Sequence, residues 1–272
     1  MRVLVTGASD GIGKATAAEL LRLGHSVVVH GRPGEKLDQA AAELARQAVG
    51  EATVHAEAAD LARLGDVVAL AERVAATFPD LQVLIHNAGI MSRKRHTTHD
   101  GVELNFGVNH LAPMLLTKEL LPTLTANAPA RIVVVSSMVH SSGEIDFADL
   151  EFTGEYDGMA AYSASKLANV YMTRVLAEQL DPAKVTINAL HPGVISTKLL
   201  HEFFSGGRDA KQGAETSVYL ATAPAVSGIT GRYFTRQSVA ESAAMEQPEH
   251  RETAQRLWKE SERMISTILG RD

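Results

Sequence analysis

The sequence contains no cysteine among its 272 residues. This absence excludes disulfide bonds, thiolate metal sites and a cysteine nucleophile, and it favours a reducing compartment, the cytoplasm. Long apolar runs are also missing, since runs such as residues 132–135 are far shorter than the ~20 residues of a membrane span. Because an apolar run follows Met1 and Arg2 directly, we expect no signal peptide and no membrane anchor.

Neither sign of charge is in large excess. Lysine and arginine total 26 while aspartate and glutamate total 32, which gives a formal net charge of −6. A mildly acidic chain argues against nucleic acid or an anionic membrane as a partner. Hydrophobic residues make up 45% of the chain, as in ordinary soluble proteins, and a chain of this length buries a core without disulfides or metals.

Short apolar segments alternate along the chain with longer segments of helical spacing. The strand candidates are residues 2–6, 26–30, 53–57, 82–86, 131–136, 186–190 and 231–235, and the helix candidates are residues 12–23, 35–49, 64–77, 101–124, 160–180 and 210–222. Such alternation predicts an α/β fold, a doubly wound parallel sheet of about seven strands with helices on both faces. No linker or repeat is visible, so we expect residues 1–272 to form a single domain.

Three segments stand outside this alternation. Residues 138–159 and 199–208 are long polar and aromatic connections, which in compact domains are usually lids or binding loops. Residues 248–269 have the spacing of an amphipathic helix. That helix either docks on the body of the molecule or forms a subunit contact.

A glycine-rich turn follows the first predicted strand. The segment reads Thr6-Gly7-Ala8-Ser9-Asp10-Gly11-Ile12-Gly13 and leads into a predicted helix. Glycines at such a turn let the backbone approach a pyrophosphate at the positive N-terminus of the helix. Their spacing differs from the G-x-G-x-x-G fingerprint of dinucleotide sites. The alternative is a turn that only packs the helix on the strand.

The end of the second predicted strand bears on the choice of cofactor. An NAD site places an acidic residue on the ribose hydroxyls at this point, whereas this sequence has His30-Gly31-Arg32. An arginine suits a 2′-phosphate through charge-assisted hydrogen bonds, so we expect NADP rather than NAD. A solvated loop arginine is the alternative, and Asp10 counts against NADP if it faces the same phosphate.

Four polar residues are candidates for catalysis. Tyr162 and Lys166 share one face of a predicted helix, where the Lys166 ammonium is expected to lower the phenol pKa and ready it for proton transfer. An ordinary exposed pair is the alternative. Ser137 closes the fifth strand at the edge where ligands bind, although serines at strand ends are most often turn or cap residues. Asn109 lies in a helix interior, where asparagine needs a partner.

Taken in order along the chain, these motifs resemble the short-chain dehydrogenases/reductases. The resemblance rests on Thr6-Gly7-x3-Gly11-x-Gly13, Asp60-Leu61, Asn87-Ala88-Gly89, Asn109, Ser137, Tyr162-x3-Lys166 and Pro192-Gly193-x3-Thr197, from about residue 1 to about residue 235. Details such as Val108-Asn109-His110-Leu111 are similar to the retinol-dehydrogenase-like branch. The resemblance implies a Rossmann fold, a nicotinamide cofactor and oxidoreductase activity on alcohols or carbonyls.

The resemblance also implies a role for each matched residue. Tyr162 would be the general acid/base, Lys166 would bond the nicotinamide ribose, Ser137 would hold the substrate oxygen, and Asn109 would anchor a water linked to Lys166. The cofactor would contact Gly7, Ser9, Gly11, Ile12 and Gly13 at its pyrophosphate and ribose, Asp60 and Leu61 at its adenine, Asn87, Ala88 and Gly89 behind it, and Pro192, Gly193, Val194 and Thr197 at its nicotinamide. Asp10 is a further candidate in the glycine turn, and it departs from the small neutral residue usual in relatives.

Apolar side chains are frequent in the two expected lids. They include Phe147, Leu150, Phe152 and Tyr156 in residues 138–159, and Leu199, Leu200, Phe203 and Phe204 in residues 199–208. Apolar walls suit a hydrophobic ligand, although the same side chains could simply pack the lids on the sheet. We therefore expect an NADP-dependent oxidoreductase for a lipophilic aldehyde, ketone or secondary alcohol. A non-catalytic nucleotide-binding sensor or scaffold on the same fold is the alternative.

Two expectations concern metals and subunits. Histidines such as His86, His110, His140 and His191 lie beside motifs, but none has the spacing of zinc ligands, so we expect no metal. In relatives, the helices that carry Asn109 and Tyr162 often form subunit interfaces. The resemblance therefore favours a homo-oligomer.

Overall fold

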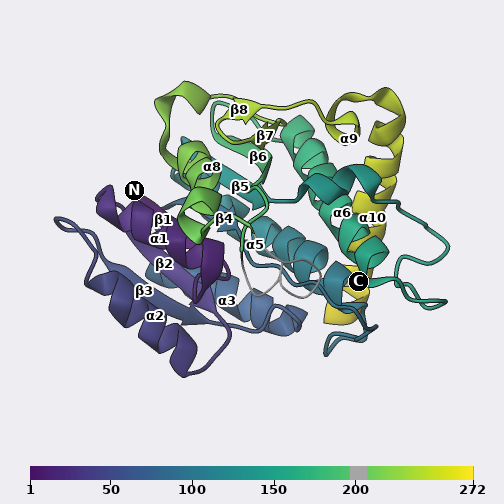
Figure 1. The fold of residues 1–272 in the computed structure, drawn as a ribbon, viewed down its shortest axis with the longest axis horizontal. Coiled ribbons are helices and arrows are strands. Elements are labelled where there is room, and N and C mark those ends of the chain that lie inside the picture. Colours follow the sequence, from purple (N-terminus) through teal and green to yellow (C-terminus); the bar gives the residue numbers. More distant parts are fainter. Residues whose placement is uncertain (197–206, 272) are drawn as a thin grey trace.

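An eight-stranded sheet forms the centre of the molecule (Figure 1). The structure, a computed structural model, describes residues 1–196 and 207–271. The strands lie in the order β3-β2-β1-β4-β5-β6-β7-β8. Their bounds are β1 Arg2–Val5, β2 Ser26–Gly31, β3 Val54–Ala58, β4 Leu81–His86, β5 Ala130–Val135, β6 Val185–His191, β7 Tyr233–Thr235 and β8 Ser238–Val239.

The apolar runs become strands because both faces of the sheet are covered. Val27, Val28 and Val29 of β2, for example, are completely buried although their side chains alternate between the two faces. Neighbouring strands pair in parallel from β3 to β7, and only β7 and β8 pair antiparallel. The predicted fold class is confirmed. The added strand β8 has two exposed residues, which leave no periodic signal in the sequence.

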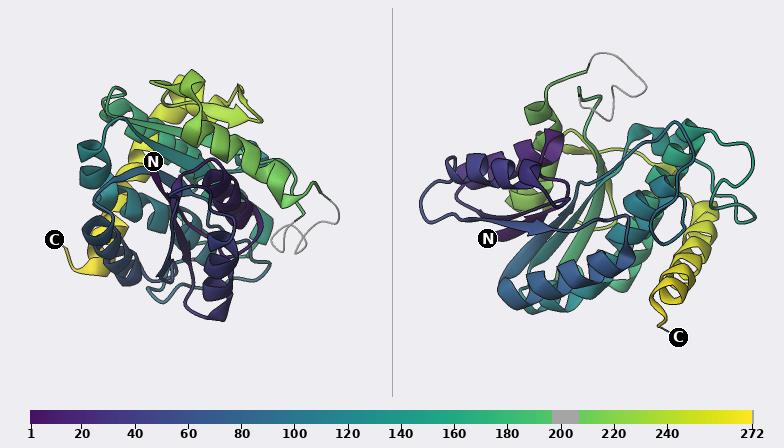
Figure 2. Two further views of the ribbon diagram at one scale, coloured as in Figure 1. Left: turned by 90° about the vertical axis from the view of Figure 1, so that its left-hand side faces the viewer. Right: turned by 90° about the horizontal axis from the view of Figure 1, so that it is seen from below.

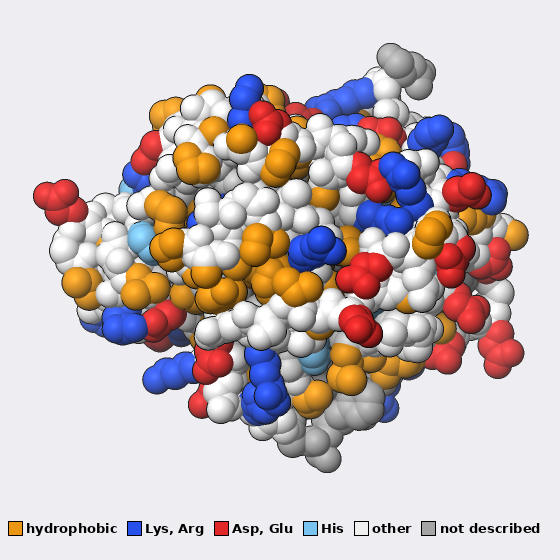
Figure 3. Space-filling model, turned by 90° about the horizontal axis from the view of Figure 1, so that it is seen from above, with side chains coloured by type: hydrophobic (Ala, Val, Ile, Leu, Met, Phe, Trp, Pro, Cys, Tyr) orange, Lys and Arg blue, Asp and Glu red, His pale blue; other side chains and the backbone are white. Residues whose placement is uncertain are grey.

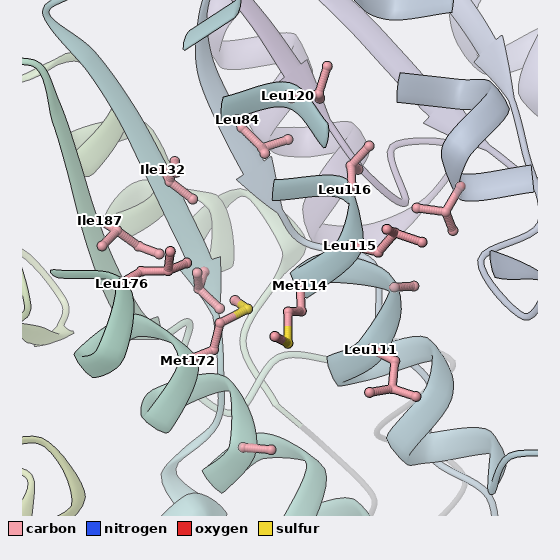
Figure 4. Close-up of a cluster of buried hydrophobic side chains, with 14 of the residues drawn as sticks. Leu84, Leu111, Met114, Leu115, Leu116, Leu120, Ile132, Met172, Leu176 and Ile187 are labelled. Atoms are coloured by element: carbon pink, nitrogen blue, oxygen red, sulfur yellow. The ribbon is translucent and has the colours of Figure 1, made fainter. Parts of the chain in front are cut away.

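Helices pack in one layer on each face of the sheet (Figure 2). On one face lie α1 (Gly11–Arg22), α2 (Glu35–Ala45) and α8 (Ala210–Thr222). On the other face lie α3 (Leu64–Thr77), α5 (Ala112–Ala126) and α6 (Gly158–Gln179). Figure 4 shows the core of this second layer, where Met114 of α5 and Met172 of α6 point toward each other beneath the strands.

The strand order reverses at the middle of the sheet. β1 lies between β2 and β4, so the chain winds outward to β3 on one side and to β7 on the other. Loops leaving the carboxyl ends of β1 and β4 turn to opposite faces at this point and leave a crevice between them. The candidate site is built around this crevice.

One helix expected from the sequence is interrupted. A single helix is predicted over residues 101–124, whereas the structure has α4 (Leu104–Phe106), a π-helical turn (Gly107–Leu111) and then α5. The prediction of a continuous helix is wrong because apolar spacing does not reveal a one-residue expansion of a helical turn. Turns of this kind are frequent at functional sites, and this one carries Asn109.

The C-terminal helix α10 (Pro248–Leu269) covers α6 (Figures 1 and 2). Its amphipathic spacing turns Leu257 and Trp258 inward, and both are buried. The Lys118 side chain of α5 forms an ion pair with Glu262 of α10. α10 therefore packs on α6 and reaches α5 through this ion pair, as the docking alternative predicts, and α9 (Ala243–Glu246) adjoins it.

Acidic and basic side chains are interspersed on the face of the molecule that Figure 3 shows, around a central apolar area. Acidic side chains gather on the right-hand side of this view. Within residues 1–196 and 207–271, no helix combines the length and the apolar content that a bilayer crossing requires.

Candidate active site

The turn after β1 is fastened to the segment after β4. The Thr6 Oγ1 accepts hydrogen bonds from the backbone N–H groups of Asn87 and Ala88, both at 3.0 Å. The Asn87 side chain donates to the carbonyl of Thr6 at 2.9 Å and to that of Gly7 at 3.2 Å. Two of the segments predicted to bind the cofactor are thus held together at the crevice.

Glycine is required at two positions of this turn. Gly7 has a φ of +66°, and a Cβ there would lie 2.7 Å from the Cα of Ala88. At Gly13 a Cβ would lie 2.3 Å from the Gly7 carbonyl oxygen and 2.4 Å from Asn87 Nδ2. The chain approaches itself too closely here for any side chain, so the turn keeps its backbone at the floor of the crevice.

His30, at the carboxyl end of β2, supports the glycine turn from behind. Its Nδ1 accepts from the Gly7 N–H at 3.3 Å, and its Nε2 donates to the Ala59 carbonyl at 3.2 Å. Burial lowers the pKa of His30 to about 4, so the ring is neutral. The sequence analysis assigned no role to His30. Its position could have indicated one, because it is a polar residue at the end of an apolar strand that lies beside the glycine turn.

Arg32 and Lys36 place two exposed cations at the end of β2, beside the same turn. Arg32 makes no hydrogen bond or ion pair with another described residue. Lys36 donates to an Asp10 carboxylate oxygen at 2.7 Å, and the other Asp10 oxygen accepts from the Gly11 N–H at 2.8 Å. The negative charge of Asp10 is therefore balanced by Lys36 and by the start of α1, which weakens the argument that Asp10 opposes a phosphate.

Asp60 and Leu61 follow β3 and close the cavity on the far side of this turn. An Asp60 carboxylate oxygen accepts from the Ala62 N–H at 3.0 Å, while Leu61 is buried. Both residues line the cavity, as the predicted adenine contacts require. The Asp60 carboxylate also shapes its own turn, because it bonds the backbone two residues further on.

Tyr162 and Lys166 lie one turn apart near the start of α6. The Lys166 Nζ is 5.6 Å from the centre of the Tyr162 ring and donates to the Val135 carbonyl at 3.0 Å. Ser137, just beyond β5, lies near enough to the Tyr162 phenol to lower its pKa. A Cβ at Gly89 would lie 3.2 Å from Lys166 Nζ, so the glycine leaves room beside the ammonium. The three side chains converge at the carboxyl end of β5.

The pKa of Tyr162 is higher than the sequence predicts. Burial raises it to about 12, and the nearby Ser137 hydroxyl offsets only part of this rise. Burial also lowers the pKa of Lys166 to about 8. Residue spacing reveals the neighbouring cation but not the loss of water around both groups, so the net shift of the Tyr162 pKa is upward, and the lowering that Lys166 contributes stays a prediction.

Asn109 is fully buried in the π-helical turn and finds its partners outside that turn. Its side-chain oxygen accepts from the Ile90 N–H at 2.8 Å, and its Nδ2 donates to the Ile90 carbonyl at 2.9 Å and to Ser165 Oγ at 3.0 Å. Asn109 thus joins the segment after β4 to α6. Its predicted contact with a water stays a prediction.

The candidate residues share one open cavity of about 2220 Å³. Those that line it are Gly7, Ser9, Asp10, Gly11, Ile12, Gly13, Arg32, Asp60, Leu61, Asn87, Ala88, Gly89, Ser137, Tyr162, Lys166, Pro192, Gly193 and Val194. Asn109 lies behind this wall, and Thr197 lies outside the described residues. The described part of the chain contains no group of three or more side chains arranged to hold a metal ion.

The segment 138–159 differs from the expected lid. Phe147 and Leu150 pack against the hydrophobic core, and the Tyr156 hydroxyl donates to the buried Glu103 carboxylate at 2.9 Å. Phe152 packs edge-on against Tyr156. The side chains from this segment that line the cavity are instead Met138, Val139 and Met159. The structure matches the alternative in which these side chains pack the segment on the body of the molecule, and residues 199–206 of the second expected lid lie outside the described residues.

Comparison with known proteins decides the family. The model of the short chain dehydrogenase family matches residues 1–207. The chain belongs to this family. Retinol dehydrogenase 14 from Homo sapiens is 40% identical to this short-chain dehydrogenase in an alignment of 297 residues. The alignment covers 98% of the chain and 86% of that protein.

Solved structures are similar over most of the chain as well. A protein of uncharacterised function from Mycobacterium paratuberculosis has a TM-score of 0.80 and 33% identity, covering 97% of this chain and 93% of its own. A Beutenbergia cavernae protein described as an NAD(P) dependent gluconate 5-dehydrogenase, with bound NADP, has a TM-score of 0.70 and 29% identity, covering 86% and 94%. This short-chain dehydrogenase is therefore an oxidoreductase that acts on CH–OH and C=O groups with a nicotinamide cofactor.

Proposed function

We propose that this short-chain dehydrogenase transfers a hydride between NADP and a lipophilic aldehyde, ketone or secondary alcohol, with Tyr162 as general acid/base. In reduction the carbonyl carbon gains the hydride and its oxygen gains a proton. In oxidation the alcohol carbon gives up the hydride and the alcohol oxygen gives up the proton. The observation that carries the proposal is the single cavity shared by the glycine turn and by Ser137, Tyr162 and Lys166. A protein that only sensed a nucleotide would need the turn but not the three polar side chains.

The residues present fit a dinucleotide. Gly7 and Gly13 hold the backbone of the turn where a Cβ would collide, and the turn leads into the positive N-terminus of α1. The cavity runs from this turn to Tyr162 and is larger than the roughly 300–1,000 Å³ of a typical small-molecule pocket. It therefore has room for a dinucleotide and a second ligand together.

Each catalytic side chain has a distinct task in the proposed reaction. When bound, the nicotinamide supplies or accepts the hydride. Ser137 holds the substrate oxygen through its hydroxyl, and Tyr162 donates the phenolic proton to that oxygen in reduction. Because burial raises the pKa of Tyr162 to about 12, the phenol is protonated at neutral pH and ready to donate. The Lys166 ammonium stabilises the phenolate that forms, at 5.6 Å from the ring centre.

The preference for NADP rests on the charges at the end of β2. Arg32 is exposed beside the cavity, and the nearby Asp10 carboxylate is paired with Lys36. A 2′-phosphate placed there would meet net positive charge, whereas the ribose hydroxyls of NAD would find no acidic partner at the end of β2.

The substrate class follows from the other end of the cavity. Apolar side chains line it beyond the tyrosine, namely Ile90, Met91, Leu104, Val108, Met138, Val139 and Met159. A wall of this kind favours an apolar substrate with a single polar oxygen. The relatives named retinol dehydrogenases are in line with such a substrate. The cytoplasmic location and the homo-oligomer stay predictions.

Replacement of Tyr162 by phenylalanine tests the proposal. We expect the variant to bind NADPH with the affinity of the wild type and to reduce decanal and all-trans-retinal at least about 10²-fold more slowly, since a positioned acid contributes about 10²–10⁴-fold. The measurements are NADPH oxidation followed by absorbance and NADPH binding followed by fluorescence. Unchanged turnover in the variant, or no turnover by the wild type with any lipophilic carbonyl, would refute the proposed reaction.

A further inference from the structure

Two imidazole rings hydrogen-bond the peptide group between Ser137 and Met138, one at its carbonyl and the other at its N–H. The Nδ1 of His140 donates to the Ser137 carbonyl at 2.8 Å, and the Nδ1 of His191 accepts from the Met138 N–H at 3.2 Å. This carbonyl and this N–H belong to one rigid planar unit. His140 comes from the turn after β5 and His191 ends β6, so the two rings reach the plane from different elements.

The hydrogen bonds assign opposite tautomers to the two rings. A carbonyl only accepts, so His140 carries its proton on Nδ1, and its Nε2 accepts from the Ser242 hydroxyl at 3.0 Å. A backbone N–H only donates, so the Nδ1 of His191 is unprotonated and the neutral ring carries its proton on Nε2. In the other tautomer, the His140 Nδ1 and the Ser137 carbonyl would both be acceptors, and the His191 Nδ1 and the Met138 N–H would both be donors.

The surroundings of both rings favour their neutral forms. His140 is 6% exposed and Ser242 is 4% exposed, and the His140 ring lies 4.5 Å from the ring of Tyr233 in β7. Burial lowers the pKa of His140 and lowers that of His191 to about 4, and the two imidazoles also interact with each other. The contacts to the peptide plane are therefore in place at neutral pH.

The plane so held controls the position of Ser137. The Ser137 carbonyl accepts a second hydrogen bond, from the His140 backbone N–H at 3.1 Å, and the Ser137 hydroxyl lies near enough to the Tyr162 phenol to lower its pKa. The plane contains the Cα atom of Ser137, so a displacement of the plane would carry the Ser137 side chain with it. A displacement near 1 Å at a reacting group can cost about 10²-fold in rate.

We propose that His140 and His191 are positioning residues, which clamp the Ser137–Met138 peptide between them and thereby fix the Ser137 hydroxyl against Tyr162 and the substrate oxygen. Ser242, from the segment before α9, sets the tautomer of His140. The inference rests on the proposed function, because it gives Ser137 its part in the reaction. It assigns a role in the active site to three more residues, namely His140 in the turn after β5, His191 at the end of β6 and Ser242 in the C-terminal part of the chain.

Matched pairs of variants test the clamp by kinetics. His140→Asn keeps a side-chain N–H near the position of Nδ1, and His191→Asn keeps an acceptor oxygen there, whereas His140→Leu and His191→Leu remove these groups. We expect each leucine variant to lower kcat for NADPH-dependent reduction of decanal at least about tenfold, and each asparagine variant to restore most of the loss. KM for decanal should change little in the His140 pair, which lies outside the cavity wall.

A control variant separates the clamp from a general loss of histidine packing. His250 on α10 pairs with the Tyr171 hydroxyl at 2.6 Å and does not line the cavity. His250→Leu should leave kcat unchanged. Equal loss of kcat in the leucine and asparagine variants, or in His250→Leu, would overturn the clamp. Full turnover in Tyr162→Phe would instead overturn the proposed function, so the two failures are distinguishable.

The tautomers give a readout that needs neither turnover nor a variant. Protein labelled with ¹⁵N-histidine is measured by long-range ¹H–¹⁵N correlation NMR at pH 7. We expect His140 to appear with its proton on Nδ1 and His191 with its proton on Nε2, both neutral. The same tautomer for both rings, or a charged imidazolium at either, would overturn the clamp whatever the kinetics show.

Discussion

The tightest steric constraint in the site belongs to one residue, Gly13. A methyl group there would lie 2.3 Å from the Gly7 carbonyl oxygen, so Gly13→Ala must shift the backbone of the turn. We expect a loss of about 1–3 kcal/mol in the free energy of unfolding, together with much weaker NADPH binding. Urea unfolding and fluorescence titration measure the two effects.

Gly65 provides a matched control for this substitution. It lies in α3, and a Cβ there would meet no atom within 4 Å. Gly65→Ala should therefore leave NADPH binding unchanged and raise the stability by up to about 1 kcal/mol, the difference in helix propensity. If both variants bind NADPH equally well, the glycine turn is not the phosphate site.

Arg32 decides between the two nicotinamide cofactors. Loss of a charge-assisted hydrogen bond of about 1.5–3 kcal/mol predicts that Arg32→Ala raises the dissociation constant of NADPH by about 10- to 100-fold. The dissociation constant of NADH should stay the same, because NADH has no 2′-phosphate. Parallel titrations of both cofactors check this, and equal weakening of both would show that Arg32 does not read the phosphate.

Sequence spacing was sufficient to place the main polar groups of the site. One helical turn separates Tyr162 from Lys166, and a strand end positions Ser137, so simple periodicity brings these side chains to one edge of the sheet. Spacing could not supply the energetics, because the pKa of Tyr162 depends on burial by distant segments. It also gave no role to His30 and His140, whose partners come from other parts of the chain.

At the scale of the element, the segment 143–157 is held to the body by a buried carboxylate. Glu103 is fully buried and accepts from the Tyr156 hydroxyl, from Asn105 and from the Phe106 N–H. Tyr156→Phe removes one of these donors, so we expect it to cost about 1–3 kcal/mol in the free energy of unfolding. KM for decanal should change little, because Met138, Val139 and Met159 form the cavity wall here.

Tyr233→Phe is the control for this loss of a hydroxyl. Its OH is buried without a hydrogen-bond partner among the described residues, so its removal should leave the free energy of unfolding unchanged or raise it. Both variants are compared by urea unfolding. A larger loss in Tyr233→Phe than in Tyr156→Phe would contradict the role given to Glu103.

The sequence predicts helices and strands correctly where a single hydrophobic periodicity extends over the whole segment. The buried strands and helices such as α3 and α8 match the predicted ranges to within about one or two residues, the usual uncertainty of element ends. The π-helical turn was missed because the buried amide of Asn109 bonds Ile90, a contact that no local pattern records. The sequence left open whether the aromatic residues after β5 line the cavity or pack on the core, because composition does not distinguish the two.

For the whole molecule, α10 bears on how copies of the chain could associate. The predicted homo-oligomer was based on the helices that carry Asn109 and Tyr162. In the structure α10 packs on α6, with Leu257 and Trp258 buried, and Glu262 of α10 forms an ion pair with Lys118 of α5. The homo-oligomer stays a prediction, and a subunit contact on this side of α6 would have to include α10.

Three buried histidines make the whole fold sensitive to acid. His30, His86 and His110 are at most 3% exposed, and burial lowers their pKa values to about 4, 3 and 3. The unfolded chain binds a proton on each ring near pH 6.5, whereas the folded chain does not until the pH falls to these lower values. The stabilisation is therefore complete above pH 6.5 and is lost as the pH falls toward 4, because the unfolded state binds more protons there.

We expect the free energy of unfolding to fall between pH 6.5 and 5.5 by up to about 1.4 kcal/mol per pH unit for each of these rings, before most carboxylates begin to titrate. Urea unfolding at pH 7.5, 6.5 and 5.5 measures the slope. His110→Leu loses the bond to Ser261 and is less stable at every pH, but its slope should be smaller by up to about 1.4 kcal/mol per pH unit, the share of one titrating ring. Equal stability at pH 7.5 and pH 5.5 would show that these imidazoles titrate normally in the folded chain, and their burial would then not oppose protonation.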